Sequence, residues 1–168
     1  MSILYIASPI QIGPGPIEIG THNDIVLRKT IQRFLPNPLP NQKRIIDAYM
    51  GYTETDGPYL MSATAGRVIM ELAAISAIAI AESLLGKKVL ILTGDRMTNS
   101  DMIEHMCTKS PFGKMLFFNP NLHIIYSEAT LGGMKYDVVL INSSRIVEYD
   151  IDRVVLETNP NRLLAIHS

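Results

Sequence analysis

The chain has 168 residues, the length of one domain, and is long enough to bury a hydrophobic core. Its 15 basic and 16 acidic residues give a formal net charge of −1, so overall charge does not indicate a nucleic-acid partner. Its single cysteine, Cys107, excludes an internal disulfide framework and a cysteine-based zinc site.

Hydrophobic residues make up 47% of the chain, which indicates either deeply buried helices or a face that meets a partner. The first residues show no basic segment followed by a sustained apolar run, so we predict no secretory signal. We expect a soluble, intracellular protein of the cytoplasm or nucleus.

The N-terminal part is predicted to be a strand followed by an irregular arm. Ser2–Ala7 (SILYIA) reads as an edge strand, and Ser8–Gly20 is too rich in proline and glycine for regular structure. Residues 1–24 are therefore expected to form a strand and a Pro/Gly-rich arm on a single domain that spans residues 1–168.

The segment from Ile25 to Ile46 has no acidic residue and five basic ones. Ile25–Phe34 has helical spacing, Leu35–Pro40 ends that helix, and Asn41 is predicted to cap a second helix that runs to about Met50. We predict that four of the basic residues form a ledge for phosphates or an acidic protein: Arg28, Lys29, Lys43 and Arg44. Two ordinary solvated helix faces remain an equal alternative.

The stretch from Tyr59 to Leu92 is predicted to be a β-α-β unit. It begins with a strand at Tyr59–Met61 and a turn of small residues at Ser62–Gly66. A long apolar helix follows at Arg67–Leu85, Gly86 ends that helix, and a second strand lies at Val89–Leu92. The helix is apolar on all sides and should be buried. Arg67, Glu71, Ser76 and Glu82 leave its apolar run shorter than the ~20 residues that a bilayer needs, so we expect no membrane partner.

The rest of the chain continues the alternation of strands and helices. We predict a short helix at Asn99–Cys107, an acidic helix or turn within Glu148–Glu157, and strands at Leu122–Tyr126, Tyr136–Ile141 and Leu163–Ile166. This alternation is typical of a three-layer α/β fold with a mostly parallel sheet.

Five segments carry a resemblance to a known family: Pro40–Lys43 (PNQK), Tyr59–Ile69, Lys87–Gly94, Lys135–Ile146 and Arg162–Ser168. Their order resembles the first RecA-like domain of superfamily-2 helicases of the DEAD/DEAH type, over about Leu39 to Ser168. In that family the corresponding segments are the PxQ entry, the Walker A strand and loop, the strand before motif Ia, the Walker B strand and the motif III strand. The resemblance implies a P-loop NTPase fold of the RecA-like class.

The position of the nucleotide loop departs from the family pattern. A P-loop needs glycines whose N–H groups surround the phosphates, a lysine to neutralise them, and a hydroxyl for Mg²⁺. The aligned residues here are Ala63, Thr64, Ala65, Gly66, Arg67, Val68 and Ile69. Val68 stands at the lysine position and Ile69 at the hydroxyl position, and using Arg67 as the lysine leaves Val68 at the hydroxyl.

The Walker B position has also lost its chemistry. One carboxylate should hold Mg²⁺ and a second should orient the attacking water, but the aligned residues are Asn142, Ser143, Ser144 and Arg145. The resemblance therefore implies a pseudo-ATPase with no catalytic residue, no metal and no cofactor. The chain ends where the first domain of the family would end, so we expect no second domain to close on a nucleotide.

Other candidate contacts lie in loops. Asp95 and Arg96 follow a predicted strand at its carboxyl end, where α/β sheets bind ligands, although a capped loop explains them equally well. Gly132 and Gly133 lie near the motif Ib position of the family, and a simple turn is the competing interpretation. No spacing among His22, His105, His123, His167 and Cys107 is typical of a metal site.

These observations predict a non-catalytic module with a regulatory or assembly role that binds a macromolecular partner, either by protein contacts, which its apolar composition favours, or through residual nucleic-acid contacts. A Rossmann-like enzyme such as a methyltransferase is an alternative, because KKVLILTGD and YDVVLIN also look like strands of that fold. It lacks a glycine-rich loop, since Thr93–Arg96 offers one glycine only. A structural or scaffold subunit is a third reading, and the oligomeric state stays open.

Overall fold

The computed structural model describes residues 4–6, 22–51, 59–62, 68–93, 120–125, 131, 133–143 and 150–167. Within these ranges, six strands form one sheet: β1 Leu4–Ile6, β2 Tyr59–Ser62, β3 Val89–Thr93, β4 Leu122–Ile125, β5 Val138–Ser143 and β6 Arg162–His167. Their order across the sheet is β1-β2-β6-β5-β3-β4, and every neighbouring pair is parallel. The predicted α/β class and the edge position of the first strand are confirmed.

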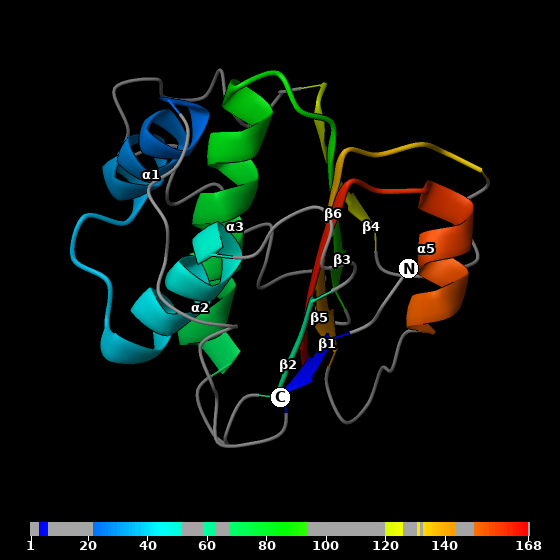
Figure 1. Cartoon of the computed structure of the whole chain (residues 1–168), viewed down its shortest axis with the longest axis horizontal. Helices are drawn as coiled ribbons and strands as arrows, with labels where there is room; N and C mark the ends of the chain where they lie inside the picture. The colour runs from blue at the N-terminus through cyan, green and yellow to red at the C-terminus, as the bar shows by residue number, and fades with distance from the viewer. Residues whose placement is uncertain are drawn as a thin grey trace.

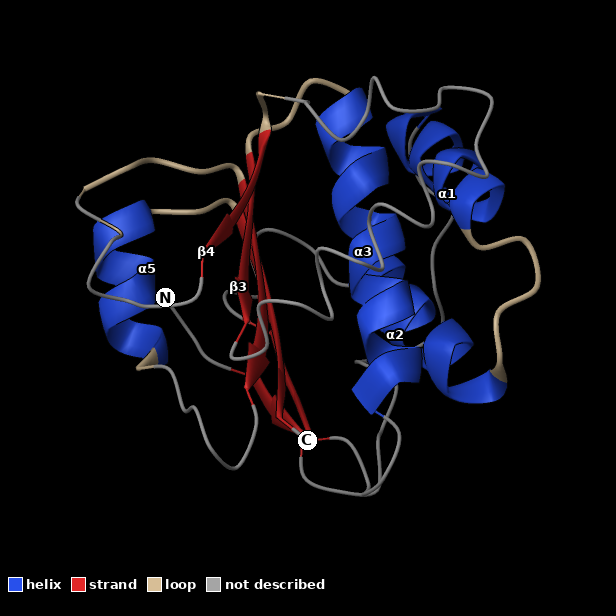
Figure 2. Ribbon diagram, turned by 180° about the vertical axis from the view of Figure 1, so that it is seen from behind, coloured by secondary structure: helices blue, strands red, loops and turns tan. Residues whose placement is uncertain are grey.

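The described helices cover both faces of this sheet. They are α1 His22–Phe34, α2 Pro40–Gly51, α3 Val68–Leu84 and α5 Ile151–Thr158. Helices α1, α2 and α3 lie on one face and α5 on the other, which gives three layers (Figure 1; Figure 2). Right-handed crossovers explain this division, because the chain moves one way across the sheet from β1 to β3 and the opposite way from β5 to β6.

The central strands bury both of their faces, as their continuous apolar runs predict. Alternate side chains pack toward different layers because successive residues of a strand point to opposite sides. Those that pack against α1, α2 and α3 are Val89, Ile91, Val138, Leu140, Leu164 and Ile166. Those on the side of α5, around its buried Val154, are Leu90, Leu92, Val139, Ile141, Leu163 and Ala165.

Helix α3 is the buried central helix that the sequence predicts. Every side chain from Ala73 to Ser83 is buried, and its five alanines in that stretch keep it thin enough to fit between the sheet and α1 and α2. It ends at Gly86, whose φ of 88° is the left-handed conformation that glycine favours. The Gly86 and Lys87 amides donate to the carbonyls of Ser83 and Glu82, at 3.2 and 3.1 Å, so two of the last carbonyls are satisfied.

The predicted start of the second helix is wrong. Helix α2 begins at Pro40, and Asn41 lies inside it instead of capping it. The Leu39 amide donates to Oε1 of Gln42 at 2.9 Å, and the Lys43 amide donates to the Leu39 carbonyl at 2.8 Å. Leu39 thus occupies the capping position. Pro40 suits the first helical position because its φ is fixed and it has no N–H to satisfy.

The predicted boundaries elsewhere differ by a few residues. Strand β5 begins at Val138 instead of Tyr136, because the Tyr136 amide donates to the Thr158 carbonyl at 3.2 Å. Within the predicted acidic segment, α5 begins after Asp150, whose side chain accepts from the Arg153 amide. The predicted helix at 99–107 lies outside the described residues.

Candidate functional site

The carboxyl ends of three strands meet at one edge of the sheet. Ser62 at the end of β2 is paired with His167 of β6, and His167 is paired with Ser143 of β5. Neighbouring strands lie about 4.8 Å apart, so the backbones of Ser62 and Ser143 are separated by roughly 10 Å. Strand β2, which precedes the predicted nucleotide loop, and β5, the predicted Walker B strand, therefore end at the same edge of the sheet, with one strand, β6, between them.

This edge is also where the chain connections diverge. Helix α3, which follows β2, lies on one face of the sheet, and α5, which follows β5, lies on the opposite face (Figure 1). In open parallel sheets, ligands bind outside the carboxyl ends of the strands at such a change of direction. The end of β6 between β2 and β5 is therefore the candidate ligand site of the sheet.

The predicted site residues at this edge are placed through their backbone alone. Val68 and Ile69 are the first two residues of α3, and Asn142 and Ser143 are the last two of β5. The pairing of Thr93 with Asn142 adds the end of β3 to the same edge. The remaining predicted loop residues lie outside the described part of the chain: Ala63, Thr64, Gly66, Arg67, Asp95, Arg96, Gly132, Ser144 and Arg145.

Gly133 lies in an exposed turn before β5. Its φ is 73°, which favours glycine, and the Met134 amide donates to the Leu131 carbonyl at 3.1 Å across the turn. No atom lies within 4 Å of the position that a Cβ of Gly133 would take, so backbone conformation and not close packing requires glycine there.

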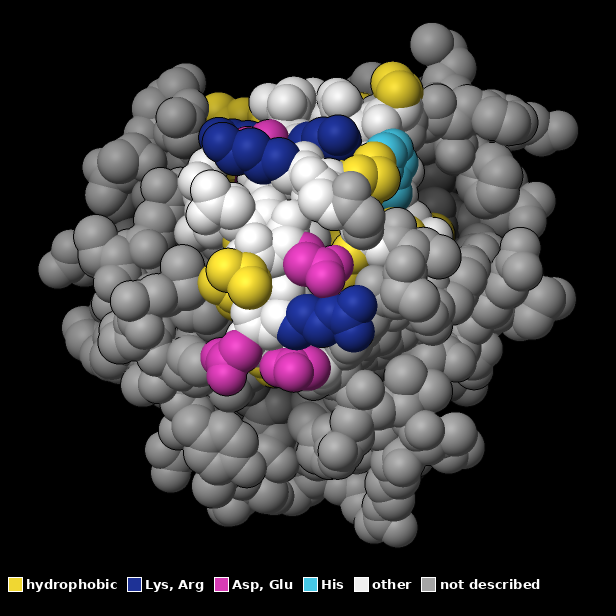
Figure 3. Space-filling model, turned by 90° about the vertical axis from the view of Figure 1, so that its right-hand side faces the viewer, with side chains coloured by type: hydrophobic (Ala, Val, Ile, Leu, Met, Phe, Trp, Pro, Cys, Tyr) yellow, Lys and Arg dark blue, Asp and Glu magenta, His cyan; other side chains and the backbone are white. Residues whose placement is uncertain are grey.

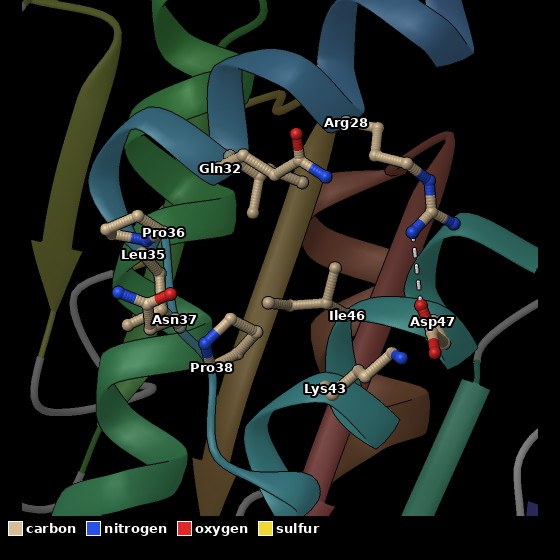
Figure 4. A pocket seen from close by; sticks show the side chains of 10 residues that line it. Arg28, Gln32, Leu35, Pro36, Asn37, Pro38, Lys43, Ile46 and Asp47 are labelled. Atoms are coloured by element: carbon tan, nitrogen blue, oxygen red, sulfur yellow. Dashed lines mark hydrogen bonds and ion pairs between the residues drawn. The ribbon is translucent and has the colours of Figure 1, made fainter.

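The four basic residues predicted to form a ledge occupy two helices, Arg28 and Lys29 on α1 and Lys43 and Arg44 on α2. Arg28 and Lys43 line one pocket between these helices, whereas the exposed Lys29 and Arg44 do not line it (Figure 4). Nη1 of Arg28 is 3.1 Å from Oδ1 of Asp47, which also lines the pocket. Consecutive helical residues point about 100° apart, which separates each cation from its neighbour in sequence.

The pocket has a volume of about 420 Å³ and combines apolar and polar walls. Its apolar lining consists of Ile31, Leu35, Pro36, Pro38 and Ile46, and its polar lining of Arg28, Gln32, Asn37, Lys43 and Asp47 (Figure 4). The sequence did not predict this pocket. The proline-rich run from Leu35 to Pro40 indicated only the end of a helix, although its first four residues, 35–38, line the pocket.

A buried polar pair joins α2 to α3 on the inner side of the helical layer. Tyr49 donates from Oη to Oε2 of Glu82 at 2.8 Å, and both side chains are buried. Burial raises the pKa of the Glu82 carboxyl, while the Tyr49 hydrogen bond and the positive charge of Arg162 oppose that rise in part. The Arg162 guanidinium lies 5.2 Å from the centre of the Tyr49 ring. Because both side chains are buried and hydrogen-bonded to each other, we assign the pair a structural role.

The exposed surface on the α5 side of the sheet carries charged and polar side chains. On the α5 face acidic and basic side chains are mixed (Figure 3), including the ion pair of Arg153 with Glu157 at 3.1 Å. Near the start of β5, Nδ1 of His123 lies 2.8 Å from the Tyr136 hydroxyl, and the Lys88 ammonium lies 5.2 Å from the Tyr136 ring centre. No group of three or more residues of metal-binding type occurs among the described residues.

The carboxylates of Asp137 and Asp150 both accept from backbone amides. Oδ2 of Asp137 accepts from the Lys88 amide at 2.8 Å, and Oδ1 of Asp150 accepts from the Arg153 amide at 3.3 Å. These bonds fix the loop before β3 and the first turn of α5.

The helices of the described chain include none that is long and apolar enough to cross a membrane. No protein-family model matches the sequence, and it matches neither a curated protein nor a solved structure. The proposal for its function therefore rests on the chain's own residues and on the geometry of the sheet edge and the α1–α2 pocket.

Proposed function

We propose that this chain is a non-catalytic, helicase-like module, a pseudo-ATPase of RecA-like type, that binds a macromolecular partner in a regulatory or assembly role. The observation that carries the proposal is the register row Ser62, His167 and Ser143 across β2, β6 and β5. The three segments that resemble the Walker A strand, the motif III strand and the Walker B strand end side by side.

This arrangement supports the proposal because the two Walker motifs act on the same nucleotide phosphates. The P-loop cradles them, while the Walker B carboxylate holds the Mg²⁺ that bridges them. A separation of roughly 10 Å between the ends of β2 and β5 lets loops from both strands reach one triphosphate. A chain in which these segments ended at opposite edges of the sheet would not suit a RecA-like domain.

The residues at those places supply no phosphate or metal chemistry. Val68 and Ile69 open α3 where a lysine and a hydroxyl should stand, and Asn142 and Ser143 close β5 where carboxylates should stand. Phosphoryl transfer depends on positioned charge, so this edge should not hydrolyse ATP. The retained fold then serves as a surface for a partner.

A protein is the partner that the described residues favour. Nucleic-acid binding depends on many cations that neutralise phosphates, but the net charge is −1 and Arg28 is already paired with Asp47. Fluorescence anisotropy with single-stranded and duplex DNA and RNA across a salt series tests this preference. We expect no binding that weakens steeply with salt.

The decisive test of the proposal is Mg²⁺-dependent ATP turnover by the purified wild-type protein, followed as phosphate release. We expect none above a blank without protein. Turnover that requires Mg²⁺ would overturn the proposal.

A second candidate is a Rossmann-like enzyme such as a methyltransferase. The pairing of Thr93 with Asn142 favours it, because β3 and β5 end together at the candidate ligand edge. A rise in melting temperature with S-adenosylmethionine, in the absence of any rise with ATP, would support this candidate over the helicase-like module.

A further inference from the structure

The pocket between α1 and α2, called here the α1–α2 groove, is open to solvent and has an apolar floor. Four of its lining residues are exposed, Gln32, Pro36, Asn37 and Lys43, while Ile31 and Ile46 are buried with 1% and 6% exposure. Its volume of about 420 Å³ lies within the range of ligand-binding pockets. Because the groove is open to solvent, it can bury one or two side chains but would leave much of a small ligand exposed.

The charges of the groove favour an anion. Among the described residues of its lining are two cations, Arg28 and Lys43, and one carboxylate, Asp47, which together give a formal charge of +1. Arg28 uses Nη1 for Asp47, and a guanidinium carries five N–H donors. Lys43 forms no ion pair with any residue that the structure describes. Figure 4 shows Lys43 and Arg28 on the same side of the groove, opposite the Asn37 and Pro36 side.

We propose that the α1–α2 groove binds a short protein segment in which an acidic residue lies next to an aliphatic one. The carboxylate meets Lys43 and the free donors of Arg28, and the aliphatic side chain packs on Ile31 and Ile46. This inference rests on the proposed partner-binding function and names the surface and the chemistry of the partner.

A protein segment fits the groove better than the other occupants. A small molecule is normally buried over most of its surface, which an open groove does not achieve, whereas peptides bind through one or two anchor side chains. A nucleic-acid strand needs several cations in a row to neutralise its phosphates, whereas the described lining offers two, Arg28 and Lys43. The apolar floor suits the aliphatic side chain of such a segment, and the charged rim suits its acidic side chain.

The first experiment is an NMR titration of the ¹⁵N-labelled full chain with the blocked peptide Ser-Gly-Asp-Leu-Gly-Ser. We expect amide shifts concentrated between residues 28 and 47 and a dissociation constant below about 1 mM. Replacing the Asp of the peptide by Asn, or its Leu by Ala, should weaken binding by roughly threefold or more. Shifts that are spread over the surface, or confined to another surface, would overturn the groove as the site.

Two neighbouring lysine and arginine variants provide the specific control. Lys43→Gln and Arg44→Gln remove the same charge from adjacent, exposed positions of α2, but only Lys43 lines the groove. We expect Lys43→Gln to weaken peptide binding roughly threefold or more, with Arg44→Gln within twofold of the wild type. Equal losses in both variants would show that binding follows overall charge, which would overturn the inference.

The remaining outcomes separate this inference from the proposed function. Specific peptide binding at another surface, without ATP turnover, overturns the groove and leaves the partner-binding module standing. Mg²⁺-dependent ATP turnover together with peptide binding in the groove would overturn the pseudo-ATPase and leave the groove standing as a peptide site. A 12-nucleotide single-stranded DNA that shifts the same amides at lower concentration than the peptide would replace the protein segment by a nucleic acid.

Discussion

The hydroxyl of Tyr49 donates a 2.8 Å hydrogen bond to the buried carboxyl of Glu82, and this contact ties the end of α2 to the end of α3. Tyr49 is completely buried and Glu82 is 6% exposed, so neither group has bulk water as a substitute partner. A buried polar group without its partner costs its full desolvation free energy. This pair therefore holds the helical layer in one arrangement and sets two predictions.

The first prediction is that Tyr49→Phe destabilises the protein by about 1–3 kcal/mol, because it leaves the Glu82 carboxyl without this donor. The free energy of unfolding is measured by urea denaturation at neutral pH. A double-mutant cycle with Glu82→Met, which has no oxygen to accept the hydrogen bond, isolates the contact from the rest of the tyrosine. If the two changes are additive within about 0.5 kcal/mol, the bond contributes nothing and the prediction is wrong.

The second prediction concerns pH. Burial raises the pKa of Glu82 in the folded protein, with Tyr49, Arg162 and Lys87 opposing and Asp137 adding to the rise. The stabilising contribution of the protonated carboxyl is complete below the unfolded pKa of about 4.3 and is lost as pH rises through the folded pKa. Glu82→Gln has no carboxyl to ionise and keeps an oxygen that accepts from Tyr49.

The stability of Glu82→Gln relative to the wild type should therefore increase with pH above about 4.3 and level off once the wild-type carboxyl is ionised. Urea denaturation of both proteins between pH 4 and pH 8 measures this difference. A difference that stays constant with pH, or that decreases, would show that the folded state does not disfavour the ionised carboxyl.

Much of the fold follows from local patterns in the sequence. The continuous apolar runs of β3 and β5 predicted parallel, doubly buried strands, and both bury every side chain described within them. The apolar α3 and its stop at Gly86 were equally local features. Hydrophobic periodicity and glycine act within a few residues, which is why a single sequence is enough to read them.

The polar contacts and the groove could not be predicted, because they join residues that are distant in sequence. Tyr49 and Glu82 are 33 positions apart, and Arg28 and Asp47 are 19 apart. Lys29 and Lys43 looked alike as basic residues, but the packing of both α1 and α2 on α3 puts Lys43 at a groove and Lys29 outside it. The prediction that Asn41 caps α2 was wrong for a local reason, because the helix begins one residue earlier, at Pro40.

The third prediction compares two buried serines of α3. Ser83 donates from Oγ to the Ile80 carbonyl at 2.8 Å, whereas the buried Oγ of Ser76 has no hydrogen-bond partner among the described residues. Ser76→Ala should leave the protein as stable as the wild type or more stable by up to about 1 kcal/mol, since alanine also favours the helix.

Ser83→Ala is the matched control, because it also removes a serine hydroxyl from α3 but abolishes a hydrogen bond, the one to the Ile80 carbonyl. It should be less stable than Ser76→Ala by about 1 kcal/mol in urea denaturation. If Ser76→Ala proves the more damaging of the two, the hydroxyl of Ser76 must have a partner in the folded protein.

The fourth prediction tests the electrostatics of the α1–α2 groove. Asp47→Asn removes the only carboxylate among the described residues of its lining, so the formal charge of these residues rises from +1 to +2. Binding of the peptide Ser-Gly-Asp-Leu-Gly-Ser should become roughly two- to fivefold tighter in an NMR titration. Asp152→Asn changes the net charge equally on the exposed side of α5 and should have no effect. An equal gain in both variants would mean that the groove charge does not matter.

The fifth prediction tests the proposed pseudo-ATPase at the sheet edge. Val68→Lys combined with Ile69→Thr introduces two Walker A side-chain types at the start of α3, yet it should not create ATP hydrolysis. Asn142 and Ser143 at the end of β5 supply no carboxylate for Mg²⁺ or for the attacking water, and in the proposed helicase-like alignment Arg67 stands where that family has a glycine. Phosphate release with Mg²⁺ and ATP should equal that of the wild type prepared in parallel. Turnover by the double variant alone would show that a carboxylate outside Asn142 and Ser143 serves the metal, and the Walker B assignment would then be wrong.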